Sequence, residues 1–170
     1  MSTDVIDRYA RGTKTRWGAI RRDLPGYLVP FGRALFASVF LLSALGHFSN
    51  ETFAYAASRG VPLANVVVPF AGFLAFFGGM SVAIGYQTRI GAWLLVLYLV
   101  PVTFVMHRYW AIADDAAATT ERAHFLKNIS MLGGALLLAY FGAGPFSIDA
   151  ARKGPTTTPG AQPPRQGSSP

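Results

Sequence analysis

The sequence predicts an all-α fold, an integral membrane four-helix bundle whose two termini both lie on the cytoplasmic side. Hydrophobic residues make up 52% of the chain and gather in four long runs instead of short amphipathic segments. Charged residues make up only 14% and lie almost entirely outside these runs, where a bilayer requires them. This pattern is typical of a multi-pass membrane protein.

The composition also excludes several classes of function. The chain has no cysteine, which excludes disulfide exchange, thiolate catalysis and cysteine-ligated zinc or iron–sulfur sites. Its net charge of +7 flanks the apolar runs, and no basic helix with interleaved aromatic residues follows the first 27 residues, so we expect no nucleic-acid partner. No carboxylate lies inside an apolar run, which disfavours a proton pump or an ion-coupled transporter.

The chain begins with a basic segment, residues 1–27, which we expect to lie beside the membrane in the cytoplasm. The apolar run that follows is too long for the core of a secretory signal. This first span, about residues 28–48, crosses a hydrocarbon layer about 30 Å thick at about 1.5 Å per residue. Near its start, Arg33 either extends to the headgroups as a cytoplasmic-side anchor, which we favour, or faces the bundle.

The second span covers about residues 63–85, after a short, nearly neutral connection. Small residues recur in it at every fourth position, and this spacing lets another helix approach closely. The third span covers about residues 90–107, after a tight turn in which Arg89 forms a second cytoplasmic-side anchor. Two groups of small residues are predicted to pack helices, one in the second span and a glycine pair in the fourth. They are Ala71, Ala75, Gly79, Ala83, Gly133 and Gly134.

The fourth span covers about residues 124–142 and follows a polar segment that we expect to be a solvated loop, with or without a short surface helix. It begins with polar side chains, becomes apolar and stops at glycines and a proline. The four spans define a domain at residues 28–149. Residues 150–170 consist mainly of Pro, Gly, Thr, Ser and Gln, and we expect a disordered cytoplasmic tail.

The distribution of basic residues predicts the orientation. The segment before the first span, the Arg89 turn and the tail hold ten Lys and Arg residues. The two opposite connections, counted together with Lys127, hold four. Since cytoplasmic loops carry the excess of Lys and Arg, both termini should be cytoplasmic.

This topology brings all three histidines to the outer face of the membrane. One histidine ends the first span, one ends the third and one begins the fourth. Polar groups at membrane depth are costly unless they have partners, so we expect a functional layer there. The candidate residues of this outer polar layer are His47, Asn65, His107, His124, Lys127 and Asn128.

A neutral imidazole or an ammonium group in this layer could donate a hydrogen bond to a quinone carbonyl, or relay protons to the outer water. The plainer alternative is that Lys127 extends to the headgroups and the histidines are only interfacial. We expect no metal site, because the histidines are scattered over three spans without a helical i, i+4 pair. We expect no haem, because two histidine ligands of a haem would lie deeper in the membrane and face each other. We assign no catalytic residue.

The order and spacing of several motifs resemble those of the DoxX family, over about residues 32–149. These motifs are Gly32 and Arg33; Phe77 to Gly79 with Gly85, Thr88 and Arg89; His107; Lys127 and Asn128 with Gly133 and Gly134; and Gly144, Ser147, Ile148 and Asp149. The resemblance implies a small four-helix protein of the bacterial plasma (inner) membrane. The family is named for a subunit associated with a quinol oxidase or a quinone oxidoreductase.

The chain departs from the family pattern at three places. Ala75 stands where many members carry an acidic residue, His47 stands where lysine is common, and Pro145 with Phe146 replaces a basic residue. Because the acidic residue is absent, a carboxylate-dependent proton step is in doubt. We therefore expect a supporting subunit more than a catalyst.

The resemblance implies an anchoring or quinone-facing subunit of a membrane redox assembly. We expect a non-catalytic subunit of an oxidoreductase complex more than an enzyme that acts by itself. Quinone is the one cofactor that it suggests. The expected partners are membrane lipid, subunits of the redox complex and a second copy of the chain in a homo-oligomer. The alternatives are a non-enzymatic membrane scaffold and a carrier for a small apolar solute.

Overall fold

The structure, a computed structural model, describes residues 26–153 of the chain. The regular elements of this range are all helices: α2 (Leu28–Gly46), α3 (Asn50–Ser58), α4 (Ala64–Ile84), α5 (Thr88–Met106), the 3-10 helix η1 (Tyr109–Ala111), α6 (Asp115–Phe141) and α7 (Ile148–Arg152). The predicted all-α fold is therefore confirmed. Residues 1–25 of the predicted basic segment and residues 154–170 of the predicted tail lie outside the described range.

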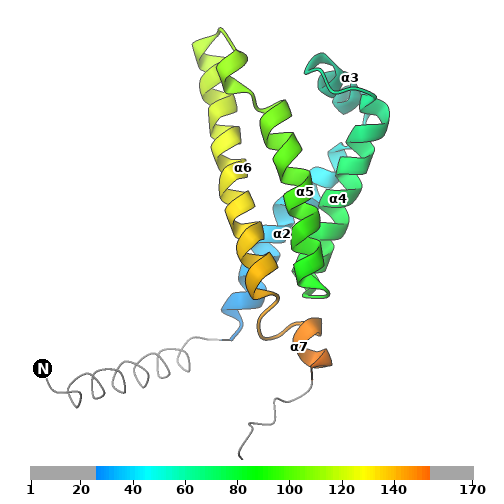
Figure 1. Ribbon diagram of the computed structural model, residues 1–170, viewed down its shortest axis with the longest axis vertical. Coiled ribbons are helices and arrows are strands. Elements are labelled where there is room, and N and C mark those ends of the chain that lie inside the picture. The colour runs from blue at the N-terminus through cyan, green and yellow to red at the C-terminus, as the bar shows by residue number, and fades with distance from the viewer. Residues whose placement is uncertain (1–25, 154–170) are drawn as a thin grey trace, which may run out of the picture.

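Four long helices, α2, α4, α5 and α6, pack around one core (Figure 1). Helix α4 packs against α2 and α5, and α5 packs in turn against α6. The largest fully buried side chains in this core are Phe40 of α2 and Leu95 and Leu99 of α5. Small residues, Ala75 of α4 and Ala135 of α6, complete it.

Glycines let these helices approach one another closely. Gly78 of α4 faces Gly91 and Leu95 of α5, and a Cβ atom at Gly78 would lie only 2.8 Å from Cδ2 of Leu95. Gly134 of α6 likewise faces the ring of Phe36 in α2. Since lipid is as apolar as a leucine side chain, close packing of this kind, and not the removal of apolar surface from water, holds membrane helices together.

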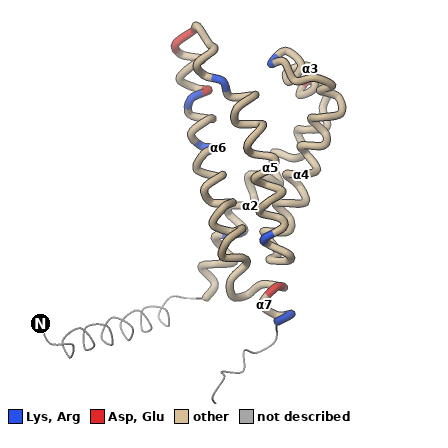
Figure 2. The backbone as a smooth tube through the Cα atoms, viewed as in Figure 1, with Lys and Arg blue, Asp and Glu red and all other residues tan. Residues whose placement is uncertain are grey.

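Three helices of the described range are long and apolar enough to cross a bilayer: Leu28–Gly46, Ala64–Ile84 and Thr88–Ala111. Large apolar side chains such as Leu42, Phe70 and Leu97 are exposed on their outer surfaces. Charged residues gather toward the two ends of the bundle (Figure 2). The chain is therefore an integral membrane helical protein.

The fourth predicted span is part of α6, which does not belong to this group of three. Its N-terminal half carries charged residues that lower its hydropathy, among them Glu121, Arg122 and Lys127. Helix α6 also begins at Asp115 instead of residue 124. Asp114 starts it by accepting a hydrogen bond from the main-chain N of Ala117 at 2.8 Å, as an N-cap residue does. Much of the segment expected to be a solvated loop is therefore helical.

Two further helices lie in segments for which the sequence analysis predicts no helix. In the connection between the first two spans, Ser49 caps α3 by accepting a hydrogen bond from the main-chain N of Thr52 at 3.2 Å. After α6, Ser147 caps α7 by accepting a hydrogen bond from the main-chain N of Ala150 at 3.0 Å. Residues 150–152, which were expected to start the disordered tail, are therefore helical.

Candidate functional site

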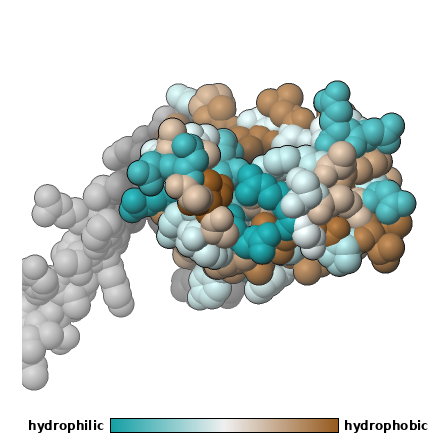
Figure 3. Space-filling view, turned by 90° about the horizontal axis from the view of Figure 1, so that it is seen from above, coloured by the Kyte–Doolittle hydropathy of each residue, from teal (hydrophilic) through white to brown (hydrophobic). Residues whose placement is uncertain are grey.

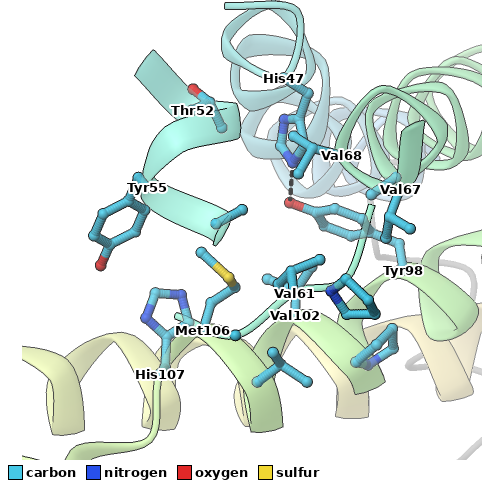
Figure 4. A pocket seen from close by; sticks show the side chains of 16 residues that line it. His47, Thr52, Tyr55, Val61, Val67, Val68, Tyr98, Val102, Met106 and His107 are labelled. Carbon is cyan, nitrogen blue, oxygen red and sulfur yellow. Dashed lines mark hydrogen bonds between the residues drawn. The ribbon is translucent and has the colours of Figure 1, made fainter. Parts of the chain in front are cut away.

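A pocket of about 470 Å³ opens at the end of the bundle that carries α3. It lies between the C-terminus of α2, helix α3 with the loop that follows it, and the facing sides of α4 and α5. Its walls are largely apolar (Figure 4), and its main apolar residues are Val61, Val67, Val68, Val102 and Met106. Seen from above, this end of the molecule presents hydrophilic side chains among apolar ones (Figure 3). The pocket therefore combines an apolar interior with a polar surround.

The inner part of the pocket contains a polar pair, His47 and Tyr98 (Figure 4). The hydroxyl of Tyr98 lies 3.4 Å from Nε2 of His47, and the two rings meet edge to face with centroids 5.6 Å apart. Nδ1 of His47 lies 2.8 Å from the main-chain oxygen of Ser43 and donates to it. In that tautomer Nε2 of His47 accepts a hydrogen bond, so the Tyr98 hydroxyl is the donor of the pair.

A glycine makes room for this pair. Gly72 of α4 faces His47, and a Cβ atom at Gly72 would lie 2.6 Å from Cβ of His47. Non-bonded carbon atoms do not approach so closely in an unstrained packing, so α2 can bring the imidazole into the pocket only beside a glycine. Gly72 was not predicted to pack helices, because it lies outside the four-residue repeat of small residues.

At the mouth of the pocket, the carboxylate of Glu121 joins three elements. It accepts a hydrogen bond from Arg59 at 2.7 Å, from His107 Nδ1 at 2.7 Å and from the Tyr55 hydroxyl at 3.3 Å. Arg59 follows α3, His107 ends α5 and Glu121 belongs to α6. In turn, Arg108 donates to the main-chain oxygen of Arg59 at 2.6 Å. This network connects α3 to the ends of α5 and α6.

The network also determines the charge of Glu121. Burial raises the pKa of its carboxyl group, but the hydrogen bond from His107 and the electrostatic effects of His107 and Arg59 outweigh burial. The net effect is a pKa below the ordinary value, so Glu121 is a carboxylate at neutral pH. A carboxylate at this position orients the ring of His107, which itself lines the pocket.

The structure brings only part of the predicted outer polar layer to the pocket. His47 and His107 line it, whereas His124, Lys127, Asn128 and Asn65 do not. The ring of His124 packs against that of His107 with centroids 5.4 Å apart, and Lys127 Nζ lies 3.5 Å from His124 Nδ1. Asn128 is buried in the bundle, and Asn65 is exposed in the first turn of α4.

The residues predicted to pack helices differ in their surroundings. Ala75 is fully buried, Ala71 and Ala83 pack at the edge of the core, and Gly79 faces Phe40 and Leu41 of α2. In the fourth span, Gly134 is in contact with Phe36, but no side chain or neighbouring backbone lies within 4 Å of the Cβ position of Gly133. The close partner Gly91 in α5 is not among the predicted residues.

The two predicted anchors lie at the opposite end of the bundle. Arg89 is exposed in the first turn of α5. Arg33, by contrast, is buried and turns inward, where its guanidinium donates to the main-chain oxygens of Ala143 and of Phe146, the latter at 2.9 Å. It therefore faces the bundle, the second of the two arrangements considered for it, and connects α2 to the loop between α6 and α7.

Asp149 of α7 connects the same end to α5. Its carboxylate accepts hydrogen bonds from the main-chain N of Gln87 at 2.8 Å and of Thr88 at 3.0 Å, and its own main-chain N donates to Gly85 at 2.8 Å. Burial raises the pKa of Asp149, but the hydrogen bonds from Thr88 and Gln87 outweigh burial and the net pKa is lowered. The network at this end thus depends on an ionised carboxylate.

The partners that orient the two pocket histidines, Tyr98 and Glu121, are not among the residues predicted from the sequence. One signal for Glu121 exists in the sequence, since it lies three residues before His124 and shares a helix face with it. For Tyr98, which lies inside an apolar run, the sequence offers no comparable signal. Within residues 26–153, no group of three or more His, Cys, Asp or Glu side chains could hold a metal ion.

Comparison with known proteins identifies the relatives of the chain. The SURF4 family model matches residues 62–154. The inner membrane protein YphA of Escherichia coli is 32% identical over 100 residues, which cover 59% of this chain and 71% of that protein. The inner membrane protein YqjF of Escherichia coli is 29% identical over 119 residues, 69% of this chain and 85% of that protein. No solved structure matches the chain significantly.

A eukaryotic relative matches over a longer stretch of this chain but a smaller share of its own length. The ER-derived vesicles protein ERV29 of Saccharomyces cerevisiae is 29% identical over 128 residues, which cover 75% of this chain but only 34% of that protein. With two inner membrane proteins among its relatives and three apolar helices, the chain is a multi-pass protein of the inner membrane.

These findings correct the resemblance to the DoxX family, which is wrong: the family model that matches is that of SURF4. The expected role as an anchoring or quinone-facing subunit of a redox assembly depended on that resemblance and is wrong with it. The physical reason is visible in the structure. Arg33 and Asp149, which belong to the motifs behind the resemblance, hold the helices together at one end of the bundle, so these motifs reflect helix packing.

Proposed function

The chain belongs to the SURF4 family, and we propose that it binds an amphiphilic molecule in the pocket beside α3. The observation that carries this proposal is the combination of apolar walls with the His47–Tyr98 pair in one cavity. A cavity of about 470 Å³ lies within the range of small-molecule sites, roughly 300–1,000 Å³. Such sites are mostly apolar and carry a few polar groups that fix the orientation of the ligand.

The polar pair can accommodate a ligand's head group without large rearrangement. At 3.4 Å the contact between Tyr98 and His47 is longer than a usual hydrogen bond between these groups. The hydroxyl of Tyr98 can therefore turn toward a carbonyl or carboxylate oxygen of the ligand at little cost. His107 offers a second polar group at the mouth, where Glu121 holds its ring.

Access from the lipid supports an amphiphile over a fully polar ligand. Two lining residues, Val67 of α4 and Val105 of α5, are exposed, and both belong to helices that are apolar enough to cross a bilayer. A molecule with an apolar chain can therefore enter from the bilayer without passing a charged surface. A polar solute would gain little from walls formed by valine, proline and methionine.

The experiment uses the full-length protein in lipid nanodiscs and a fatty-acid probe that carries a diazirine and an alkyne. After irradiation, peptide mapping locates the label. We expect labelled peptides from the pocket, and less label in Val102→Trp, which fills the cavity. Val100→Trp is the matched control, because Val100 lies on the same helix but is exposed on its outer surface. Uniform labelling of all lipid-facing surfaces, or an equal loss of label in both variants, would contradict the proposal.

A second variant separates the polar pair from the cavity itself. Tyr98→Phe keeps the ring and removes the hydroxyl, and we expect it to reduce labelling by the fatty acid about fivefold, the loss of one hydrogen bond. A hydrocarbon diazirine probe without a carboxylate should label wild type and Tyr98→Phe equally. Unchanged labelling by the fatty acid would show that the pair does not contact the head group.

We also propose that α6 supplies a fourth span and that both termini lie in the cytoplasm. The C-terminal half of α6 is apolar, packs on α5 and contributes to the same core as the three other long helices. When the whole sequence is counted and Arg33 is left out, ten Lys and Arg residues lie on the proposed cytoplasmic side and four lie on the opposite side. With this orientation, the pocket lies near the outer face of the inner membrane.

A further inference from the structure

A second cavity, of about 570 Å³, lies at the end of the bundle opposite α3, between the start of α5, the end of α6 and helix α7. Three basic side chains line it: Arg89, Arg152 and Lys153. We propose that this cavity binds the phosphate group of an anionic membrane phospholipid. The proposed function concerns the other end of the bundle, so this inference does not depend on it.

The charges of the lining residues favour an anion. Within residues 26–153, none of the three basic side chains takes part in a salt bridge. One carboxylate, that of Asp149, also lines the cavity, which leaves three positive charges against one negative charge. Both oxygens of Asp149 already accept hydrogen bonds from the main-chain N–H groups of Gln87 and Thr88. Lys153 acts electrostatically on this carboxylate, so the two arginines, Arg89 and Arg152, are the groups most available for a phosphate.

Packing holds the two arginines beside the cavity. The guanidinium of Arg152 lies over the ring of Tyr86, 4.6 Å from its centroid, in a cation–π contact. Arg89 lies beside Gly142, where a Cβ atom would be 3.5 Å from Arg89 Nε. Gly142 has a φ of +79°, a conformation that glycine adopts without strain, and so the chain turns there without a side chain in the cavity.

Apolar residues on one side of the cavity favour a lipid over a free phosphate ion. Ile90 and Phe141 line the cavity and are 58% and 72% exposed. They continue into the apolar outer surfaces of α5 and α6, where acyl chains lie. A phospholipid can therefore contact the basic groups with its phosphate and these two side chains with its acyl chains, whereas inorganic phosphate can use only the basic groups.

Native mass spectrometry of the full-length protein in detergent tests this inference, with palmitoyl-oleoyl phosphatidylglycerol as the anionic probe and the matching phosphatidylcholine as the zwitterionic one. We expect tighter binding of phosphatidylglycerol, and a loss in the variant R89Q/R152Q. The loss should be about fivefold for each arginine, since a basic residue near the membrane surface contributes roughly 1 kcal/mol to the binding of anionic lipid.

The control variant is R122Q/K127Q, which removes two exposed basic side chains from α6 toward the α3 end of the bundle and makes the same change in net charge. It should bind phosphatidylglycerol as wild type does. Circular dichroism and size-exclusion chromatography check that both variants are folded. Equal binding of the two lipids, an equal loss in both variants, or inorganic phosphate that raises the melting temperature as much as phosphatidylglycerol would overturn the inference.

Discussion

Asp149 caps α5 from a distance: its Oδ2 lies 3.0 Å from the main-chain N of Thr88, which precedes it by 61 residues. Gln87 donates to the other oxygen of the same carboxylate at 2.8 Å. An N-cap usually comes from the residue just before a helix, but here it comes from the last helix of the described chain. Asp149 thus fastens α7 to the turn between α4 and α5.

Replacement of this cap should destabilise the bundle. We expect Asp149→Ala to lower the free energy of unfolding by about 1–2 kcal/mol, the usual cost of losing a side-chain cap. Asp149→Asn keeps one acceptor oxygen and should cost less. The measurement is the thermal midpoint of the purified protein in detergent. A midpoint of Asp149→Ala equal to that of wild type would contradict this role.

The contribution of Asp149 should depend on pH in a defined direction. Its folded-state pKa lies below the ordinary value of 3.8, because hydrogen bonds to the carboxylate outweigh burial. Stability from such a group is present above the unfolded pKa and is lost as the pH falls through the folded pKa. We therefore expect wild type to exceed Asp149→Asn in stability at pH 7, and the difference to shrink below about pH 4. A difference that stays constant down to pH 2 would contradict this assignment.

The helix contact at Gly78 should not tolerate a methyl group. A Cβ atom there would lie 2.8 Å from Leu95 Cδ2 and 2.9 Å from the main-chain oxygen of Gly91. We expect Gly78→Ala to cost about 1–3 kcal/mol, as overpacking does, which would be visible as a lower thermal midpoint. Gly133→Ala is the control, since its Cβ would meet nothing within 4 Å. That variant should be neutral or slightly more stable, because alanine favours a helix over glycine.

The orientation can be tested cleanly because the chain contains no cysteine. We expect a cysteine at Thr119 to react with a membrane-impermeant maleimide added to intact spheroplasts. Cysteines at Gln87 and at Ser168 should react only after permeabilisation. If α6 did not cross the membrane, Thr119 and Ser168 would lie on one side and would react alike.

The long helices could be predicted from the sequence because the bilayer determines their length. The expected spans match α2, α4 and α5 to within two residues at each end. The start of α6 could not be predicted in this way. It depends on the cap at Asp114 and on an alanine-rich turn, which hydropathy does not detect.

The pocket itself could not be predicted from the sequence, which indicated only a layer of polar residues at one membrane face. His47 and His107 were singled out because they end predicted spans, and both line the cavity. Their partners Tyr98 and Glu121 depend on how neighbouring helices are rotated against each other, which a single sequence does not determine. The motifs behind the mistaken family resemblance include Arg33, Thr88 and Asp149, all of which join helix ends. Residues of this kind indicate how the helices are arranged and do not indicate a particular chemical function.

The contact of Arg33 with the main-chain oxygen of Ala143 has a consequence for biogenesis. The two residues are 110 positions apart, so most of the chain must leave the ribosome before this guanidinium meets its acceptors. Until then the guanidinium of Arg33 lacks its two main-chain acceptors in that loop. The first long helix can therefore reach its final packing at this end of the bundle only after α6 and the loop that follows it have been synthesised.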